Sequence, residues 1–520
     1  MNSRLQLYPL PRIGVALILG IVFGDFFHAS VPTFLWLLCT LVGLMFYFLS
    51  RRKPLLQSGM LLGSVFLLGS WLVNVKENQL KFIDTQTERV YQGVVVSKPV
   101  VRGKVVVFDM MVIDDNHPIK IRTSMMWDSS RNKHLLPEIG IGLLVQSRIK
   151  PFVQKDSLSN FHVVRWAQVQ GYRGQTYIDD EKIRYSVVSL SSFSWLQKAR
   201  LRAMKWRNNL VNTFPIEAND SSDIAIVAAM TLGDKSGLSQ ATKQLFSITG
   251  SSHVLALSGL HLGIIYAILM FAFSRRKKRI WAQMIVILAI WTYVLLTGLP
   301  TSLVRAATMF TILGLVSLAH RSAYTINSLS LAAIIMLVAN PLLMWDIGFQ
   351  LSFAAVFAIL LFFQWLESWG FNPHTVLQKA FATFVLLPIA AQIGTFPLVL
   401  YHFGQFSSCF LLSNLIVVPA AMVIIFGTLL SFVFWFIPFL RTLVFLAMRE
   451  IVRWLQISLS LIASIPYSSV SGIRISELQV ILIYLLTISV LGIIHHLLKA
   501  IDNGRKLKTI CLGHVNISFR

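Results

Sequence analysis

The sequence predicts a polytopic α-helical membrane protein of about 12 spans, with a small all-β extracytoplasmic domain inserted after the third span. Hydrophobic residues make up 55% of the 520 residues and charged residues 13%, whereas a soluble globular protein carries about 25% charged residues. The mean hydropathy is +0.67. Long apolar segments occur on both sides of residues 76–190, where the hydrophobic runs shorten and begin to alternate. The chain therefore divides into membrane spans and one domain of a different kind.

Residues 1–75 hold the first three predicted spans, at 12–28, 31–49 and 55–75. A helix of about 20 residues crosses a hydrocarbon core roughly 30 Å thick. The basic run Arg51-Arg52-Lys53 lies between the second and third segments, and short basic loops mark the cytoplasmic side. We therefore expect a cytoplasmic amino terminus and an extracytoplasmic position for the chain after residue 75.

Residues 76–190 read as a β-rich domain. Five segments show the alternation of half-buried strands, at 89–96, 104–113, 119–126, 141–149 and 162–169. Five short strands suit a small barrel, and the oligonucleotide-binding (OB) barrel is one five-stranded form. The domain is therefore predicted to be OB-like.

Basic and aromatic side chains are interleaved along this predicted domain. Stacking platforms beside basic groups are how OB barrels hold single-stranded nucleic acid. The alternative for any one residue is a packed core aromatic or a solvated charge, because aromatic side chains are common in cores. The candidate DNA-binding residues are Lys98, Arg102, Lys104, Lys120, Arg122, Lys150, Arg165 and Trp166.

Residues 191–252 are predicted to form helices at the membrane surface. The stretch 191–213 is basic and amphipathic, which favours a helix lying in the interface plane, although it could also line a nucleic-acid path. The turn Gly233-Asp234-Lys235 follows a short apolar helix, and Gly233 is expected to end it in the left-handed conformation. The turn lacks the Gly-Lys-Ser/Thr of a phosphate-binding loop.

Residues 253–498 contain nine further predicted spans, at 253–273, 280–298, 302–319, 326–340, 347–366, 380–400, 407–430, 442–464 and 475–498. The basic run at 275–279 and the basic tail at 499–520 both fall on the cytoplasmic side if residue 253 starts outside. The formal net charge of +24 serves orientation in the membrane, an anionic ligand, or both.

These spans contain polar residues that hydrocarbon does not favour. A charged side chain at membrane depth costs about 2.5–3.5 kcal/mol on insertion scales. Ser258-Gly259 would let the helix break or let another backbone approach closely, and a break is tolerated where it lines a cavity or is buried in protein. The alternative for Arg305 and Asp346 is an anchoring role near the interface. The candidate lining or motif residues are His253, Ser258, Gly259, His261, Gly298, Arg305, Asp346, Gln350 and Gln392.

A catalytic or metal site is the alternative interpretation of the same stretch. His253 and His261 lie about 80° apart on an unbroken helix, which suits one metal ion poorly. Ser258 and His261 could form a nucleophile and base, but an orienting third group is not evident nearby. The three cysteines lack metal-ligand spacing. We expect neither metal nor cofactor, and a membrane-embedded hydrolase using His253, Ser258 and His261 remains the alternative.

The run His253-Val-Leu-Ala-Leu-Ser-Gly-Leu-His261 resembles the ComEC family of bacterial competence proteins. The resemblance extends upstream through Leu232-Gly-Asp-Lys-Ser236. It extends downstream through Leu296-Thr-Gly-Leu-Pro-Thr-Ser-Leu-Val-Arg305-Ala and Asp346-Ile-Gly-Phe-Gln-Leu-Ser352. These elements stand in the order and spacing of the family and cover residues 215–440.

The resemblance implies a channel in the bacterial cytoplasmic membrane that carries single-stranded DNA inward during natural transformation. It places the β-rich domain outside, where DNA arrives, and His253, Ser258, His261, Arg305, Asp346 and Gln350 at or near the path. The chain lacks the metallo-β-lactamase-like cluster His-x-His-x-Asp-His of many family members, and it lacks a nucleotide-binding motif. We therefore expect no nuclease activity in this polypeptide, and separate DNA receptor, nuclease and cytoplasmic motor proteins as partners. A homo-oligomer remains open.

Overall fold

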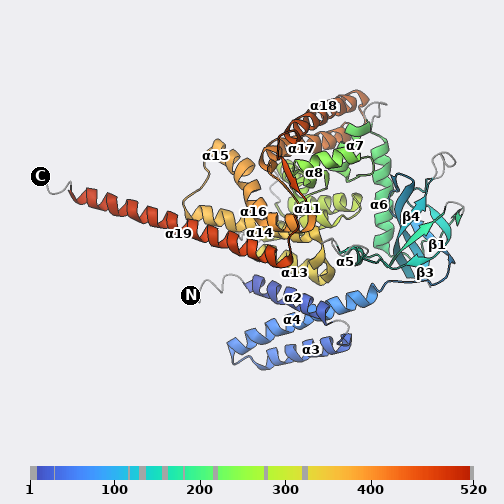
Figure 1. The fold of residues 1–520 in the computed structure, drawn as a ribbon, viewed down its shortest axis with the longest axis horizontal. Coiled ribbons are helices and arrows are strands. Elements are labelled where there is room, and N and C mark those ends of the chain that lie inside the picture. The colour runs from blue at the N-terminus through green and yellow to red at the C-terminus, as the bar shows by residue number, and fades with distance from the viewer. Residues whose placement is uncertain are drawn as a thin grey trace.

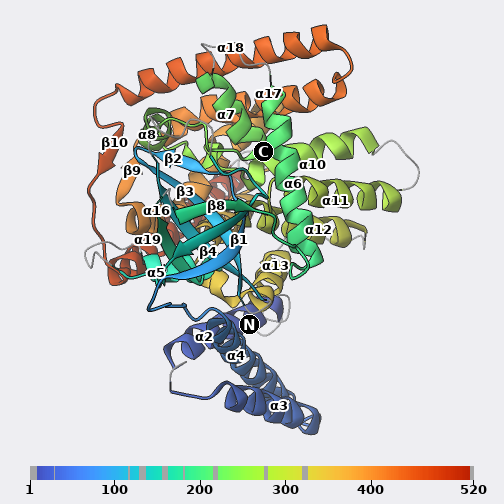
Figure 2. The same cartoon turned by 90° about the vertical axis from the view of Figure 1, so that its right-hand side faces the viewer.

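The computed structural model describes residues 9–27, 30–114, 117–127, 136–154, 162–179, 182–214, 221–273, 279–318 and 326–515. Its first three helices are α2 (Pro9–Phe26), α3 (Thr33–Leu49) and α4 (Pro54–Gln79). They form a group of their own beside the larger bundle (Figures 1 and 2). The three amino-terminal helices predicted from hydropathy are present.

Small residues let α2 and α4 approach closely. A Cβ atom added at Gly20 would overlap the main chain of Phe66. Ser70 Oγ donates to the Gly20 carbonyl at 2.8 Å, and Asn74 Nδ2 donates to the Gly24 carbonyl at 3.0 Å. Close backbone contact with polar side chains between helices is the usual way that membrane helices associate.

The β-rich domain (residues 76–190, here the β-domain) contains one curled, half-barrel sheet. Its strands run in the order β6-β7-β4-β3-β1-β5-β8, with β2 paired to β3. Only the β4–β7 pairing is parallel within the described residues. The strands are β1 (Arg89–Val95), β2 (Val100–Arg102), β3 (Val105–Asp114), β4 (His117–Met126), β5 (Gly142–Ser147), β6 (Ile149–Lys150), β7 (Gly174–Ile178) and β8 (Ile183–Ser186).

Alternation along β3 and β4 builds the core of the β-domain. Val106, Phe108 and Met110 on β3 are buried and pack with Ile121 on β4. Arg148 alone separates β5 from β6, so one stretch of chain borders β1 at one end and β7 at the other. This sharing curls the sheet.

One strand prediction was wrong. Residues 162–169 form a helix, α5 (Val163–Val169). The buried contacts of Val163, Trp166 and Ala167 fall at positions i, i+3 and i+4, which is the helical period and not the alternation that predicted a strand. The short strands β2, β7 and β8 were not predicted.

The predicted basic amphipathic helix is α6 (Trp195–Asn212). It lies between the sheet and the bundle and runs across the direction of α14 and α19 (Figure 1). Leu201 and Met204 pack against Val94 and Met111 of the sheet. Arg207 donates to the Thr297 carbonyl at 3.1 Å on the bundle side.

The bundle is built around α7 (Ser221–Leu232), whose apolar residues 225–230 are almost fully buried against α17 and α18. Figure 2 shows the sheet in front of this bundle. The remaining elements are α8 (Gln240–Ile248), α9 (Ser252–Leu255), α10 (Gly259–Phe273), α11 (Arg279–Leu296), α12 (Thr301–Leu318), α13 (Ile326–Ala339), η2 (Pro341–Trp345), α14 (Ile347–Ser368), α15 (Val376–Phe381), η3 (Ala382–Leu386), α16 (Leu387–Phe403), β9 (Gln405–Ser407), α17 (Phe410–Val433), α18 (Pro438–Ala463), β10 (Ser469–Ser471) and α19 (Glu477–Val515).

Six helical stretches of the described chain are long and apolar enough to cross a membrane. They are Pro9–Phe26, Pro54–Gln79, Ile347–Ser368, Val376–Phe403, Phe410–Val433 and Glu477–Leu497. Six shorter apolar helices accompany them, five of which coincide with predicted spans. The predicted span 442–464 is helical but carries Arg449, Glu450 and Arg453 and falls outside both groups. The chain is therefore a membrane protein, and the number of about 12 spans stays a prediction.

Candidate functional site

The predicted helix break is present between α9 and α10. α9 ends at Leu255, Ala256 is extended, and α10 begins at Gly259. The backbone N–H of Ser258 donates to His261 Nδ1 at 3.1 Å. In a capping box, the side chain three residues into a helix accepts from the N-cap backbone in this way. His261 thus takes the place of the usual Glu or Gln and starts the second half of the helix.

His261 is fully buried, and its two ring nitrogens differ. Because Nδ1 accepts from a backbone N–H, the ring hydrogen is on Nε2. Nε2 has no partner among the described residues. Ser258 Oγ also lies 2.7 Å from Nδ1, so two donors compete for one lone pair. This geometry stabilises a helix start and leaves an unsatisfied donor beside it.

Two further motif segments meet the break at Leu257. Gly233 has φ +73° as predicted, and a Cβ atom there would lie 2.5 Å from Leu257 Cδ1. Ser302 Oγ donates to the Leu257 carbonyl at 2.6 Å, satisfying a group that the break would otherwise orphan. Gly298, with φ +89°, forms the turn that leads to Ser302.

Asp234 ties this region to the β-domain. Its carboxylate accepts from Lys98 Nζ at 2.7 Å and from Ser236 N and Oγ at 3.0 and 2.7 Å. Burial opposes ionisation of Asp234, but these hydrogen bonds outweigh it and hold its pKa below the ordinary value. The neighbouring Lys235 is exposed.

Arg305 and Asp346 form a buried ion pair. Arg305 Nη1 lies 3.2 Å from Asp346 Oδ1, and the side chains are 5% and 11% exposed. The same Oδ1 accepts from Phe349 N at 2.7 Å and caps α14. A buried, paired arginine of this kind is not a snorkelling anchor.

Gln350 extends this polar group toward α16. Its Nε2 donates to the Met344 carbonyl at 2.9 Å, and its Oε1 lies 2.9 Å from His402 Nε2. His402 was not predicted as a site residue. It lies just beyond the end of the predicted span 380–400, a position that alone did not distinguish it from an interface residue.

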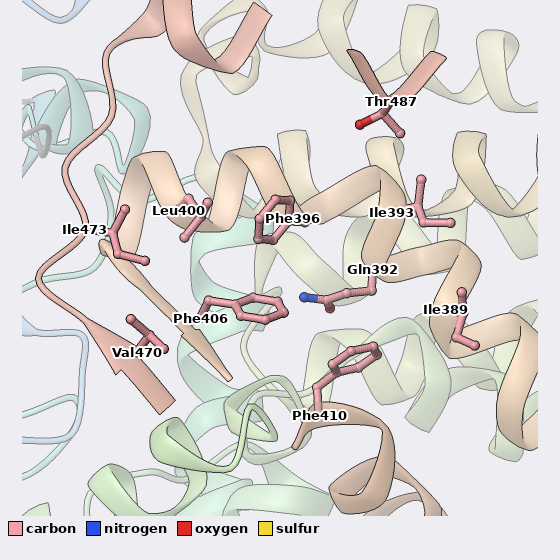
Figure 3. Close-up of a pocket in the computed structure, with 10 residues that line it drawn as sticks. All are labelled: Ile389, Gln392, Ile393, Phe396, Leu400, Phe406, Phe410, Val470, Ile473 and Thr487. Atoms are coloured by element: carbon pink, nitrogen blue, oxygen red, sulfur yellow. The ribbon is translucent and has the colours of Figure 1, made fainter. Parts of the chain in front are cut away.

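Gln392 lines a mainly apolar cavity of about 460 Å³. Figure 3 shows its amide pointing among Phe396, Phe406 and Phe410. A second cavity of about 430 Å³ lies between α10 and α17, beginning at Leu260 directly after the break.

Some basic residues of the β-domain are exposed, and others already contact carboxylates or aromatic rings of the protein. Arg102 and Lys104 flank the β2–β3 turn and are exposed, as is Lys150. Lys120 Nζ lies 3.2 Å from Asp109 and 4.1 Å from the Tyr172 ring centroid. Burial lowers the pKa of Lys120.

Arg122, Arg165 and Trp166 already have contacts. The Arg122 guanidinium lies 5.1 Å from the Trp166 ring centroid, and Trp166 packs against Phe152 and Tyr172. Arg165 pairs with Asp25 and Glu77. Sequence reasoning missed both acids, although Asp25 is the one acidic residue within the predicted span 12–28.

A model for competence proteins matches residues 230–497. The chain is 30% identical over 240 residues to ComE operon protein 3 of Bacillus subtilis, covering 45% of this chain and 29% of that protein. It is 27% identical over 220 residues to an uncharacterized protein of Aquifex aeolicus (42% and 50%) and 23% identical over 207 residues to Recombination protein 2 of Haemophilus influenzae (37% and 26%). The matches thus span about a quarter to a half of these relatives. No solved structure matches the chain.

Proposed function

Because this chain belongs to the competence protein family, we propose that it forms a channel that carries single-stranded DNA across the bacterial cytoplasmic membrane during natural transformation. The family match and the similarity to ComE operon protein 3 support a role in competence and DNA uptake. The observation that carries the channel proposal is the buried polar cluster at the broken helix. Segments 232–236, 253–261 and 296–305 converge on Leu257, and Arg305 links them to Asp346.

The chemistry of this cluster suits a polyanion. A strand of DNA needs donors shielded from lipid, and broken helices around polar residues are how transporters line a path through the bilayer. His261 Nε2 and Arg305 Nε are buried donors with no partner among the described residues. In the proposed channel, phosphates passing the break would accept from such donors.

The proposal gives the β-domain the role of receiving DNA outside the cell membrane. The pairing supports an OB-like interpretation: β1, β3 and β4 form a meander, β7 pairs parallel to β4, and β5–β6 connects β1 with β7. OB folds bind oligonucleotides with the loops after their first and fourth strands. Arg102 and Lys104 lie in the first of these loops, and α5 lies in the second.

The proposed channel has cytoplasmic termini and works with separate proteins that deliver, degrade and pull DNA. The exposed run Arg51-Arg52-Lys53 supports this orientation. The run at 275–278 and the side chains of the tail lie outside the described residues. A membrane-embedded hydrolase remains the second candidate, because Ser258 Oγ lies 2.7 Å from His261 Nδ1. Against it, Nδ1 also accepts the backbone N–H.

The decisive experiment follows labelled duplex DNA in cells with and without the gene. The proposal expects DNA to stay outside the cytoplasmic membrane in the deletion strain and one labelled strand to enter when the gene is restored. Equal entry in both strains would contradict it.

Binding can be measured separately on the purified full-length protein. We expect its affinity for oligothymidylate to fall with salt. Replacing Arg102→Ala together with Lys104→Ala should lower the slope of log affinity against log salt by about 0.7 for every phosphate of the single strand that the variant no longer binds. Lys182→Ala is the matched control, since Lys182 pairs with Glu88 at 2.8 Å. Equal slopes in all variants would remove the role of the β2–β3 turn.

A further inference from the structure

Arg165 lies where three parts of the molecule meet. Its Nη1 is 2.6 Å from Glu77 Oε1 at the end of α4, and its Nη2 is hydrogen-bonded to Asp25 of α2. Its guanidinium carbon is 4.3 Å from the ring centroid of Trp345, in η2. The β-domain, the amino-terminal helices and the bundle thus share one side chain.

The contacts engage both Nη nitrogens and one face of the guanidinium, and Nη1 also donates to Gln168 Oε1 at 3.2 Å. Two carboxylates take its edges and an indole takes a face, the arrangement for which a planar arginine is better suited than lysine. The Arg165 side chain is 22% exposed and that of Glu77 8%, so solvent screens the pair less than it would a surface bridge. A DNA phosphate that took the two Nη nitrogens would have to displace both acids.

The position of Arg165 links it to the buried ion pair. Trp345 directly precedes Asp346, which caps α14 and pairs with Arg305. Val169, one turn further along α5, packs in one cluster with Leu342 and Phe349. The helix α5 therefore lies on the segment that presents Asp346.

We propose that Arg165 is a positioning residue, which fixes the β-domain on α2, α4 and η2 so that a strand leaving the domain meets the Arg305–Asp346 pair. A second ion pair, Lys98 with Asp234 at 2.7 Å, holds the β1–β2 loop of the domain to the bundle. The docking is independent of any ligand, whereas its consequence for uptake rests on the proposed function.

The test uses the full-length protein with Arg165→Ala and, separately, with Asp25→Asn and Glu77→Gln together. Both changes should raise amide hydrogen exchange in residues 163–169 and 341–349. Both should cause a measurable loss of transformation, because a strand would leave the β-domain away from the Arg305–Asp346 pair, and both should leave oligothymidylate affinity and its salt slope unchanged. Arg102→Ala, on the exposed turn, is the control that should weaken DNA binding and leave exchange unchanged.

The variant with Asp25→Asn and Glu77→Gln distinguishes an Arg165 that docks the β-domain from an Arg165 that binds phosphate. It keeps side-chain volumes nearly constant, so it carries the test if Arg165→Ala fails to accumulate. Tighter DNA binding on neutralising the acids, or a salt slope lower by about 0.7 in Arg165→Ala, would make Arg165 a phosphate contact and overturn the inference. Unchanged exchange in both variants would also overturn it. Raised exchange in a protein whose wild type imports no DNA would uphold the docking and reject the channel.

Discussion

His261 is the residue on which the channel and hydrolase interpretations differ most clearly. As a capping acceptor it needs only an atom that accepts the Ser258 N–H, whereas as a general base it needs an imidazole. The observed 3.1 Å contact from the backbone favours the first role.

We therefore expect His261→Gln to retain most transformation and His261→Leu to lose it together with stability of about 0.5–2 kcal/mol, the usual effect of losing a helix cap. Transformation frequency and thermal unfolding in detergent measure the two effects. Loss of function in His261→Gln at unchanged unfolding temperature would instead show that the imidazole itself is needed, either as a phosphate donor or as a base.

The Arg305–Asp346 pair allows a second test at a single site. Arg305→Ala leaves a buried carboxylate without its partner, and removing one partner of such a pair costs about 3–5 kcal/mol. Arg305→Leu with Asp346→Asn removes both charges, keeps an oxygen to cap α14, and should recover most of that stability. If the pair serves DNA passage, the double variant should unfold like wild type yet transform poorly. Recovery of both properties would reduce the pair to a structural role.

The sequence identified these residues as unusual but did not reveal their partners. Arg305 and Asp346 stood out because charge in an apolar span is costly. Lys98 was predicted to contact DNA, and its pairing with Asp234 was not predicted. Nothing local in either segment specifies a contact between residues 136 positions apart.

At the scale of elements, the Lys98–Asp234 contact makes the docking of the motif turn on the β-domain pH-dependent. The pKa of Asp234 in the folded protein lies below its ordinary value of 3.8. The stability that this shift contributes is therefore fully present above pH 3.8 and is lost as pH falls through the lower, folded pKa.

We expect hydrogen exchange in residues 233–238 to be constant from pH 7 to about pH 4, once corrected for intrinsic rates, and to rise below it. In Asp234→Asn, the free energy of local opening should be lower by about 1 kcal/mol at neutral pH, a small value because Lys98 is partly exposed. Its exchange should show no such rise at acid pH. An acid step that persists in Asp234→Asn would assign it to another group.

Helices and strands were predicted correctly where the hydrophobic residues followed a single period. The alternation in 104–113 and 119–126 predicted β3 and β4, and Ser258-Gly259 predicted the break, because both signals are local. Prediction failed at 162–169, where an apparent alternation outweighed the helical spacing of Trp166 and Ala167. The short strand β7 is defined mainly by its parallel pairing with β4, which arises only in the folded domain.

At the scale of the whole molecule, we expect the β-domain and the loop at 51–53 to lie on opposite sides of the membrane. In a chain whose Cys39, Cys409 and Cys511 are replaced by serine, Lys104→Cys should react with a membrane-impermeant maleimide in intact cells. Lys53→Cys, at a position that is also exposed, should react only after lysis. The reverse pattern would invert the orientation and place the β-domain in the cytoplasm.

The length of α4 has a consequence at this same scale. Its predicted span, residues 55–75, measures about 32 Å at 1.5 Å per residue, close to a hydrocarbon core of roughly 30 Å, and the polar residues 76–79 continue the helix beyond it. In a thinner bilayer this apolar stretch would exceed the core and tilt to fit it, and α2 would follow because the two helices are in backbone contact. Glu77, at the far end of α4, would then move with the acyl-chain length of the surrounding lipid. The contact between Arg165 and Glu77 is thus coupled to bilayer thickness. The docking of the β-domain should therefore depend on lipid composition.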